Sequence, residues 1–243
     1  VERAKAARCS ALVLTLDLQI LGQRHADIRN GLSIPLKIKL SNLFDLLSKP
    51  SWCYQMARTK NRTFGNVMGH VKDITNLNSL TKWVQDQFDT RLNWDDVKRI
   101  KDWWGGKLII KGIMDPDDAK MAQKCGADAL VVSNHGGRQL DGVNSSISTL
   151  PEIKKAVSNM EVLMDGGISS GQDILKAIAM GAEGVMIGRS FVYGLSAGGK
   201  EGVTKSLEIL NKELDMTMAL CGRRDIKDVG RDIIKDCPFF EKN

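Results

Sequence analysis

The stretch 129–142, which reads ALVVSNHGGRQLDG, constrains the fold of this chain more than any other. Its first four residues are apolar and partly β-branched, the pattern of a strand buried on both faces of a parallel sheet. The next residues are polar and glycine-rich, which places His135 and Arg138 just beyond the strand's carboxyl end, where parallel α/β proteins bind ligands. A proton-accepting histidine beside a permanently charged arginine predicts a site for a small anion. The alternative is a loop whose His135 and Arg138 are only solvated.

A weak internal repeat extends this interpretation to the rest of the chain. The segments CGADALVVSNHGG and MGAEGVMIGRS share a Gly-Ala-acid sequence at a helix end, followed at once by a strand. Strands are expected at 11–16 and from about 108, 129, 162 and 184, which is the spacing of successive βα units. Such units form a right-handed parallel sheet. Five strands are predicted, whereas a closed (β/α)8 barrel needs eight.

Helices are predicted between these strands from capping signals. Asn93 and Asp115 are expected to cap helices, the second with Pro116 at its first position, and Ser170 and Asp173 form a capping pair. The predicted helices cover residues 1–7, 80–88, 94–104, 116–125, 151–157, 171–180 and 202–220.

Composition limits the class of protein. The chain has 243 residues, of which 42% are apolar and 26% charged, as in a soluble globular protein with a core. No apolar run is long enough to span a membrane. The five cysteines form no CxxC pair, so we expect reduced thiols and no metal site.

The net charge of +6 and the pI of about 9.0 raise the hypothesis of nucleic-acid binding. The charge is concentrated, because residues 31–72 contain seven basic residues and one acid, Asp45, and so account for all of it. This argues against nucleic acid. The same segment is apolar and aromatic without a strong helix or strand pattern, and it belongs to a long insertion at about 25–80. It fits a membrane-surface or partner-binding insertion, or equally a loop packed on its own domain.

Every predicted strand is followed by polar or glycine residues at its carboxyl end. Because this holds for five strands in succession, an active site explains the pattern better than chance placement of polar residues. These residues are Thr15, Asp17, Lys111, Ser133, His135, Arg138, Asp165, Gly167, Gly188 and Arg189. The sequences DGG at 165–167 and GRS at 188–190 bring glycine amides, a helix N-terminus and an arginine together, as phosphate sites do. Each glycine alone is also explained by a tight turn.

The segments TLDLQILGQRHADIRNG, KLIIKGIMDPDDA, VVSNHGGRQLDG, LMDGGISSG and GVMIGRSFVYGL resemble the FMN-dependent L-2-hydroxy acid dehydrogenases and oxidases. The resemblance covers nearly the whole chain. It implies a (β/α)8 TIM barrel of the FMN-dependent type, of which residues 1–243 supply about strands 4–8 and the C-terminal helices. The pattern NLFDLLSKPSW…FGN is similar to the membrane-associated lactate and mandelate dehydrogenases, which favours a membrane-surface role for the 31–72 segment.

The resemblance also implies roles for individual residues. His135 would be the general base, Asp17 would hold its imidazole, and Lys111 would contact the flavin and stabilise charge there. Arg24 and Arg138, with His135, would bind the substrate carboxylate. The FMN contacts would be Thr15, Lys111, Ser133, Asp165, Gly166, Gly167, Ile168, Ser169, Gly188 and Arg189. Ser169 departs from the family motif DGGxR, which puts the affinity for FMN in doubt.

The function implied is oxidation of an L-2-hydroxy acid, most simply L-lactate to pyruvate. Electrons would pass to quinone or another respiratory acceptor, from a homo-oligomer, expected to be a tetramer, at the cytoplasmic face of the cell membrane. One alternative is a soluble glycolate or related oxidase that uses oxygen. A second is a non-catalytic fragment lacking the first three barrel units. A third, a phosphate-binding barrel without redox chemistry, leaves Arg24, Lys111, His135 and Arg138 unexplained.

Overall fold

The computed structural model describes residues 1–20, 22, 24–31, 40–60, 65, 83, 86 and 88–235. The chain divides into two compact units. The first comprises Val1–Leu18 and Arg91–Asn243, and the second comprises Gln19–Thr90. The insertion expected at about 25–80 falls within the second unit.

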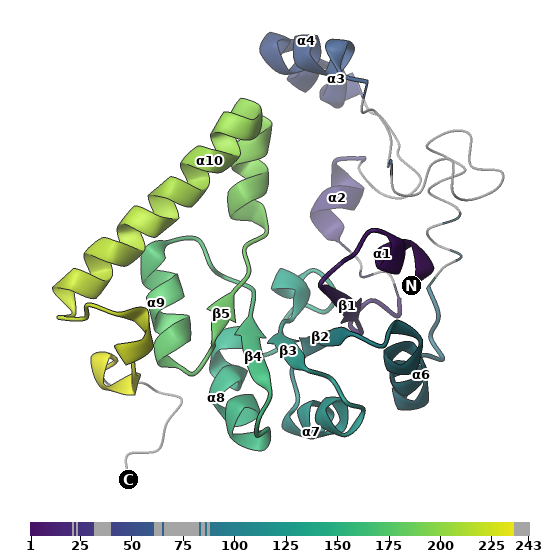
Figure 1. Ribbon diagram of the computed structural model, residues 1–243. Helices are drawn as coiled ribbons and strands as arrows, with labels where there is room; N and C mark the ends of the chain where they lie inside the picture. Colours follow the sequence, from purple (N-terminus) through teal and green to yellow (C-terminus); the bar gives the residue numbers. More distant parts are fainter. Residues whose placement is uncertain are drawn as a thin grey trace. The chain divides into compact units, whose positions relative to one another are not determined.

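The first unit contains a five-stranded, wholly parallel sheet whose strands lie side by side in chain order (Figure 1). Its strands are β1 (Ala11–Thr15), β2 (Lys107–Ile113), β3 (Ala129–Val132), β4 (Glu161–Met164) and β5 (Gly184–Val185). All five were predicted, and the parallel α/β architecture is confirmed. Because the strands are parallel, their carboxyl ends share one edge of the sheet.

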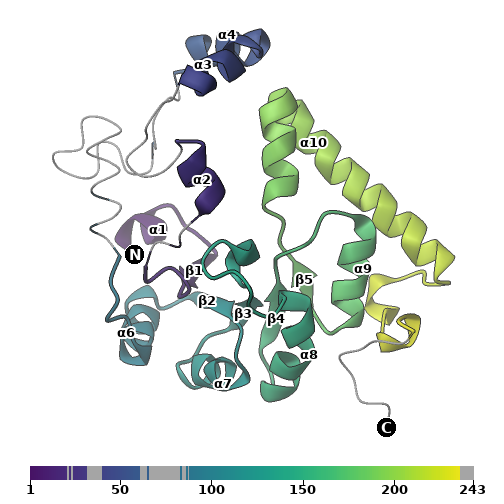
Figure 2. The same cartoon turned by 180° about the vertical axis from the view of Figure 1, so that it is seen from behind.

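Among the described helices of this unit, four connect the strands and pack against the sheet, one precedes β1, and one follows β5 (Figure 2). They are α1 (Glu2–Ala6), α6 (Trp94–Trp104), α7 (Pro116–Lys124), α8 (Ser146–Ala156), α9 (Gly171–Ala179) and α10 (Arg189–Leu220), with three short 3-10 turns, η1 (His135–Gly137), η2 (Ile226–Asp228) and η3 (Arg231–Ile233). The predicted caps are confirmed. The side chain of Asn93 accepts hydrogen bonds from the first turn of α6, Asp115 does so for α7, and Ser170 and Asp173 form a capping box on α9.

The core lies between the sheet and these helices. All four residues of β3 are buried, as predicted for a central strand of a parallel sheet. Leu150 and Ile153 on α8 are fully buried against the same core. The prediction that 11–16 is a buried strand was wrong, because the residues of β1 are only partly buried and Val13 is 47% exposed. Among the described strands β1 pairs only with β2, so its side chains have fewer neighbours.

The Gly-Ala-acid repeat corresponds to a repeated contact at the amino edge of the sheet. Asp128 donates its N–H to the carbonyl of Leu108 at 2.8 Å, and its Oδ2 accepts the N–H of Leu108 at 2.9 Å. Glu183 and Val162 make the same two contacts one repeat later, at 2.9 and 2.7 Å. A lysine from the helix that precedes the partner strand also pairs with each acid: Lys101 on α6 with Asp128, and Lys154 on α8 with Glu183.

Two predicted boundaries were wrong, and one helical arm was not predicted. The helix expected from Pro151 begins at Ser146, where Ser145 caps it, and Pro151 lies buried inside it. Gly198 and Gly199 have non-helical backbone angles and divide α10 into two arms, so the second arm confirms the helix expected from about Gly202, whereas the first arm, which begins at Arg189, was not predicted. Lys111 lies inside β2 rather than at its end, since the strand continues through a register shift to Ile113.

The second unit contains the helices α2 (His25–Arg29), α3 (Leu40–Leu47) and α4 (Pro50–Arg58). Helices α3 and α4 therefore lie within residues 31–72, where the sequence shows no strong helix pattern. Pro50 occupies the first turn of α4, where its missing N–H costs nothing, and it separates α4 from α3. Most of the helix expected at 80–88, and residues 32–39, 61–64 and 66–72 of the basic segment, fall outside the described residues.

Candidate active site

His135 lies in a tight turn directly after β3. Its backbone has a φ of 57°, unusual for a residue other than glycine, and Gly136 and Gly137 also have positive φ values. The His135 N–H donates to Ser133 Oγ at 3.1 Å, and the Gly137 N–H donates to Asn134 Oδ1 at 3.2 Å. The side chains of two residues thus hold the backbone turn that orients the imidazole.

The imidazole of His135 faces the carboxylate of Asp17, from the loop after β1. Nδ1 of His135 lies 3.4 Å from Asp17 Oδ1 and 3.3 Å from Oδ2, and only the contact to Oδ1 has hydrogen-bond geometry. The side chains are 27% and 15% exposed. A proton on Nδ1 shared with Asp17 leaves Nε2 as the basic nitrogen. This arrangement can accept a proton and stabilise the resulting cation.

A second polar group connects β2, β3 and β4. Lys111 Nζ donates to Ser133 Oγ at 2.8 Å and lies 2.9 Å from Asp165 Oδ2. The Lys111 and Asp165 side chains are only 13% and 18% exposed. Ser133 also accepts the His135 N–H, so this group is linked directly to the histidine turn. The structure therefore brings together Asp17, Lys111, Ser133, His135 and Asp165, all predicted from the sequence.

The loop 165–170 leads into α9, whose N-terminus is already occupied by carboxylates. Asp173 Oδ2 accepts hydrogen bonds from the backbone N–H and the hydroxyl of both Ser169 and Ser170, at 2.9 to 3.1 Å. Burial raises the pKa of Asp173, but these hydrogen bonds outweigh it and leave the pKa lowered. Glu213 accepts the N–H of Gly171 at 2.9 Å. These amides of α9 are therefore engaged within the protein.

In contrast to the start of α9, the start of α10 has free space beside its backbone. Gly188 precedes the helix without a side-chain cap, and a Cβ built on Gly188 or on Gly167 would meet nothing within 4 Å. Arg189 is exposed, and its Nη2 lies 3.3 Å from the position of a Cβ on Gly136, so it reaches the histidine turn. An anion near this helix start would meet a helix N-terminus and an arginine.

The other site residues predicted from the sequence include Thr15, Arg138, Ile168 and Arg24. Thr15, the last residue of β1, is the register partner of Lys111. Arg138 directly follows η1 and is exposed. Ile168 is buried in the core, so its backbone rather than its side chain faces the site, and its carbonyl accepts the Ser190 hydroxyl at 3.1 Å. Arg24 precedes α2 in the second unit and is described only within it.

Four residues at the site were not predicted as site residues. Gly112 contacts Asp17, and Gln139 donates to the Asp17 carbonyl. Asn134 Oδ1 and Ser146 Oγ both lie close to Gly166, 3.5 and 2.9 Å from the position of a Cβ there. A glycine inside a strand is a signal of a bulge or close approach, and it could have identified Gly112.

Comparison with known proteins identifies the family. The profile of the FMN-dependent dehydrogenases matches residues 1–236. The chain belongs to the FMN-dependent dehydrogenase family. It is 42% identical over 238 residues to the L-lactate dehydrogenase of Actinobacillus pleuropneumoniae serotype 5b, covering 97% of this chain and 62% of that protein. The L-lactate dehydrogenase of Acinetobacter baylyi is 39% identical over 236 residues, covering 96% and 61%.

Solved structures of related proteins support the same family assignment. The monotopic membrane protein (S)-mandelate dehydrogenase has a TM-score of 0.87 and 33% identity, covering 94% of this chain and 60% of that one. A mandelate oxidase has a TM-score of 0.70 and 33% identity, covering 94% and 57%. The predicted family, its FMN dependence and the FMN-type barrel fold are confirmed. This chain spans less than two thirds of each of these relatives' length.

The residues of the first unit fit FMN. Asp165 Oδ1 and Ser146 Oγ are buried without a hydrogen-bond partner among the described residues, and the ribityl hydroxyls of FMN can satisfy such groups. The open space at Gly188, beside Arg189, suits a phosphate. Lys111 supplies a partly buried cation for a ring that gains negative charge.

Two further findings concern only the part of the chain that the structure describes. No helix there combines the length and the apolar character needed to cross a bilayer. No group of three or more His, Cys, Asp or Glu side chains there is arranged to hold a metal ion.

Proposed function

We propose that this chain carries catalytic residues of an FMN-dependent L-2-hydroxy acid dehydrogenase that oxidises L-lactate to pyruvate. The observation that carries the proposal is the His135–Asp17 pair, linked through Ser133 to the buried cation of Lys111. A base and a cation at one sheet edge are the groups that oxidation of a hydroxy acid beside a flavin requires. Relatives at 42% identity that are named L-lactate dehydrogenase support this substrate.

His135 is the proposed general base. Its Nε2 removes the proton of the substrate hydroxyl, while Asp17 orients the imidazole and stabilises its cation. A positioned base of this kind contributes about 10²–10⁴-fold to a rate. Hydrogen bonds at such sites are often long before a substrate binds, so a contact of 3.4 Å is compatible with this role.

Arg138 and Arg24 are the proposed ligands of the substrate carboxylate. A guanidinium binds a carboxylate through two parallel hydrogen bonds, which a lysine cannot reproduce. The exposed position of Arg138 beside the histidine turn is compatible with this role.

FMN, when bound, supplies the acceptor of the two electrons that leave the substrate carbon. The residues proposed to hold its ring are Thr15, Lys111 and Ser133, and those proposed for the ribityl phosphate are Asp165, Gly166, Gly167, Ile168, Ser169, Gly188 and Arg189. Lys111 places a positive charge where negative charge develops on the ring. The Asp165 carboxylate keeps Lys111 in place.

Activity measurements test this proposal. The protein supplied with FMN is assayed with L-lactate, D-lactate and glycolate, using a quinone analogue or oxygen as acceptor. We expect turnover with L-lactate and quinone, and little with D-lactate. Peroxide formation from glycolate would replace the proposal with an oxidase, and absence of turnover with every pair would contradict an enzymatic role for this chain.

A membrane-surface location and quinone as acceptor are the second part of the proposal. Helix α3 exposes its apolar side chains at positions 40, 43, 44 and 47, one face of a helix, and α4 exposes Trp52 and Tyr54. Lys49 and Arg58 supply positive charge beside these residues. An amphipathic basic segment of this kind binds anionic bilayers in the interface plane.

Vesicle flotation tests the membrane location. The protein should float with vesicles containing phosphatidylglycerol, and the double substitution Phe44→Ser and Leu47→Ser should reduce the floating fraction. The matched control is Leu220→Ser, which removes an exposed leucine from the end of α10. Equal flotation of the double variant and the wild type would exclude α3 as the membrane contact.

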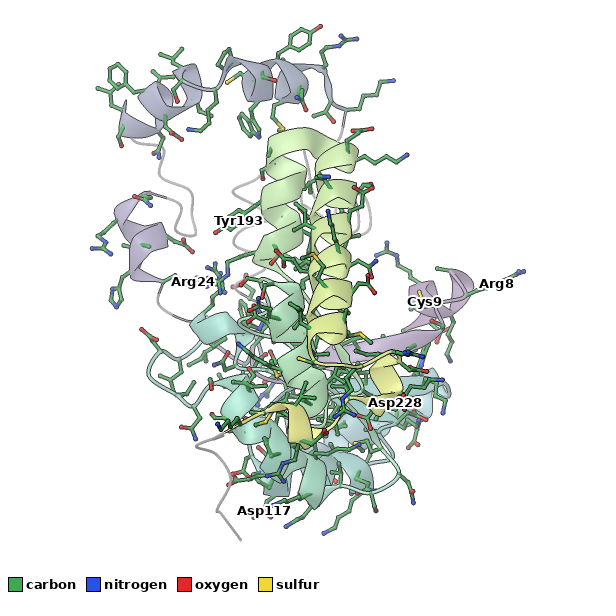
Figure 3. All side chains as sticks on the ribbon, turned by 90° about the vertical axis from the view of Figure 1, so that its left-hand side faces the viewer. Arg8, Cys9, Arg24, Asp117, Tyr193 and Asp228 are labelled. Atoms are coloured by element: carbon green, nitrogen blue, oxygen red, sulfur yellow. The ribbon has the colours of Figure 1, made fainter. Side chains whose placement is uncertain are left out.

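The third part of the proposal is that the protein forms a homo-oligomer. Helix α10 exposes several large apolar side chains, namely Val192, Tyr193, Leu195, Leu207 and Ile209, and Figure 3 labels Tyr193. Such side chains are favourable in an interface between copies. Sedimentation measurements should give a tetramer mass, and a monomer at micromolar concentration would contradict this part.

A further inference from the structure

Gly112 lies in β2 next to Asp17, at the point where the pairing of β2 with β3 is irregular. Its φ is +99°, and the register of β2 against β3 shifts between Lys111 and Ile113. A Cβ on Gly112 would lie 2.7 Å from Asp17 Cγ, 2.8 Å from Asp17 Cβ and 3.0 Å from its backbone nitrogen. Real Cβ atoms do not approach other atoms this closely, so any side chain at 112 must displace Asp17.

Gln139 also holds Asp17, through its backbone carbonyl. It lies four residues beyond His135, in the same loop, and its Nε2 donates to the backbone carbonyl of Asp17 at 3.0 Å. One hydrogen bond therefore joins the loop that carries the base to the loop that carries the carboxylate. Gly112 limits where the Asp17 side chain can lie, and Gln139 fixes the backbone from which it projects.

We propose that Gly112 and Gln139 are positioning residues that hold the Asp17 carboxylate against Nδ1 of His135. Neither touches the reacting atoms in this assignment; both act through Asp17. The contact they maintain is already 3.4 Å long, so a displacement of a few tenths of an ångström takes it beyond hydrogen-bond distance. The consequence for turnover rests on the proposed function, whereas the geometry of the pair does not.

Two variants and two matched controls test the proposal. Gly112→Ala introduces the clash, and Gln139→Met removes the donor at similar size. Gly105→Ala is the control for backbone strain, because Gly105 has a φ of +69° and a Cβ there meets nothing within 4 Å. Gln123→Met is the control for loss of an amide, because Gln123 Nε2 also donates to a backbone carbonyl, that of Ser158.

The first readout is independent of activity. The chain has three histidines, so its imidazole ¹H–¹⁵N spectrum is simple, and the signals that His135→Gln removes belong to His135. These nitrogen shifts report whether Nδ1 carries a hydrogen-bonded proton. We expect Gly112→Ala and Gln139→Met to move the Nδ1 shift in the direction that Asp17→Asn moves it, and both controls to leave it unchanged.

The second readout is turnover with L-lactate by the FMN-loaded protein. A misplacement of about 1 Å can cost about 100-fold, which is the fall in kcat expected for Gly112→Ala. Loss of one neutral hydrogen bond corresponds to about a 2- to 10-fold fall for Gln139→Met. In an Asp17→Asn background, Gly112→Ala should lower kcat no further than Gly105→Ala does.

The outcomes separate the two proposals. An unchanged His135 Nδ1 shift in both folded variants would overturn the positioning role, and if Gly112→Ala fails to fold, Gln139→Met alone decides it. Shifted His135 signals in a protein that oxidises no hydroxy acid would support the positioning role and contradict the proposed function. Additive effects of Gly112→Ala and Asp17→Asn on kcat would show that Gly112 acts elsewhere than on Asp17.

Discussion

Nδ1 of His135 lies 3.4 Å from Oδ1 of Asp17, although 118 residues separate the two in the chain. The parallel sheet produces this contact, because the loops after β1 and β3 emerge at the same edge. β2 lies between these two strands, so the loop of Asp17 must cross its end, and it does so over Gly112. The pair therefore depends on the strand between its two members as well as on the strands that carry them.

Asp17→Asn should reduce turnover strongly. The amide can still contact His135 but no longer stabilises its cation, so a fall in kcat within the range of about 10²–10⁴-fold is expected. KM for L-lactate should change little, because Asp17 does not contact the substrate in this account. Steady-state kinetics test this, and a fall in kcat smaller than 3-fold would assign Asp17 a structural role only.

Lys111→Met should destabilise the protein as well as weaken FMN binding. It leaves the Asp165 carboxylate, only 18% exposed, without its cation, which should lower the free energy of unfolding by about 1–3 kcal/mol. Adding Asp165→Asn should recover part of that loss, because the unpaired charge is then removed. Urea denaturation of the wild type, the two single variants and the double variant measures these changes in the free energy of unfolding. Lys120→Met is the control, since Lys120 pairs with Asp117 on the surface and should matter little.

Asp128→Asn should change stability in a pH-dependent way. Burial raises the pKa of Asp128, but hydrogen bonds from Lys101, Lys107 and the Leu108 N–H outweigh it and hold the pKa well below its usual range. A carboxyl whose folded pKa is lowered stabilises the fold above its unfolded pKa of about 3.9 and loses that contribution as the pH falls towards the folded pKa.

Thermal denaturation from pH 7 to pH 2 tests this. The wild type should be more stable than Asp128→Asn above about pH 4, and the difference should shrink below that pH. Asp228→Asn, which changes an exposed carboxylate at the end of η2 (Figure 3), is the control. A difference for Asp128→Asn that stays constant down to pH 2 would mean that its charge is not what stabilises the fold.

Ser169→Arg should strengthen FMN binding. The resemblance places an arginine at this position in the family, and an arginine contact to an anion contributes about 1.5–3 kcal/mol, or roughly tenfold or more in Kd. The variant gives up the Ser169 hydroxyl bond to Asp173, but Ser170 keeps that capping contact. Flavin fluorescence titration measures the Kd, with Ser158→Arg as a control for added charge. An unchanged Kd would show that residue 169 does not face the cofactor.

Much of the first unit could be predicted because local signals and tertiary structure agree there. The buried strand β3 has a continuous apolar run, and Asn93, Asp115 and Ser170 cap the helices that follow them. The residues that follow each strand predicted the site, because parallel strands end at one edge. Asp17, Lys111, Ser133, His135 and Asp165 meet for this reason.

The errors arose where tertiary contacts override local preference. Pro151 suggests a helix start, but burial of Leu150 and Ile153 keeps it inside α8. Gly198 and Gly199 do break the helix, as their sequence suggests, but the arm of α10 that precedes them was not predicted. The role of Gly112 depends on the distance to a residue far away in the chain, which no local pattern reports.

The most direct test of the account is anaerobic addition of L-lactate to the FMN-loaded protein and to its His135→Gln variant, followed by visible absorption. The account predicts that L-lactate bleaches the flavin band of the wild type, that D-lactate does not, and that His135→Gln bleaches at least about 100-fold more slowly while still binding FMN. Equal bleaching rates in the wild type and the variant would contradict the central claim that His135 is the base.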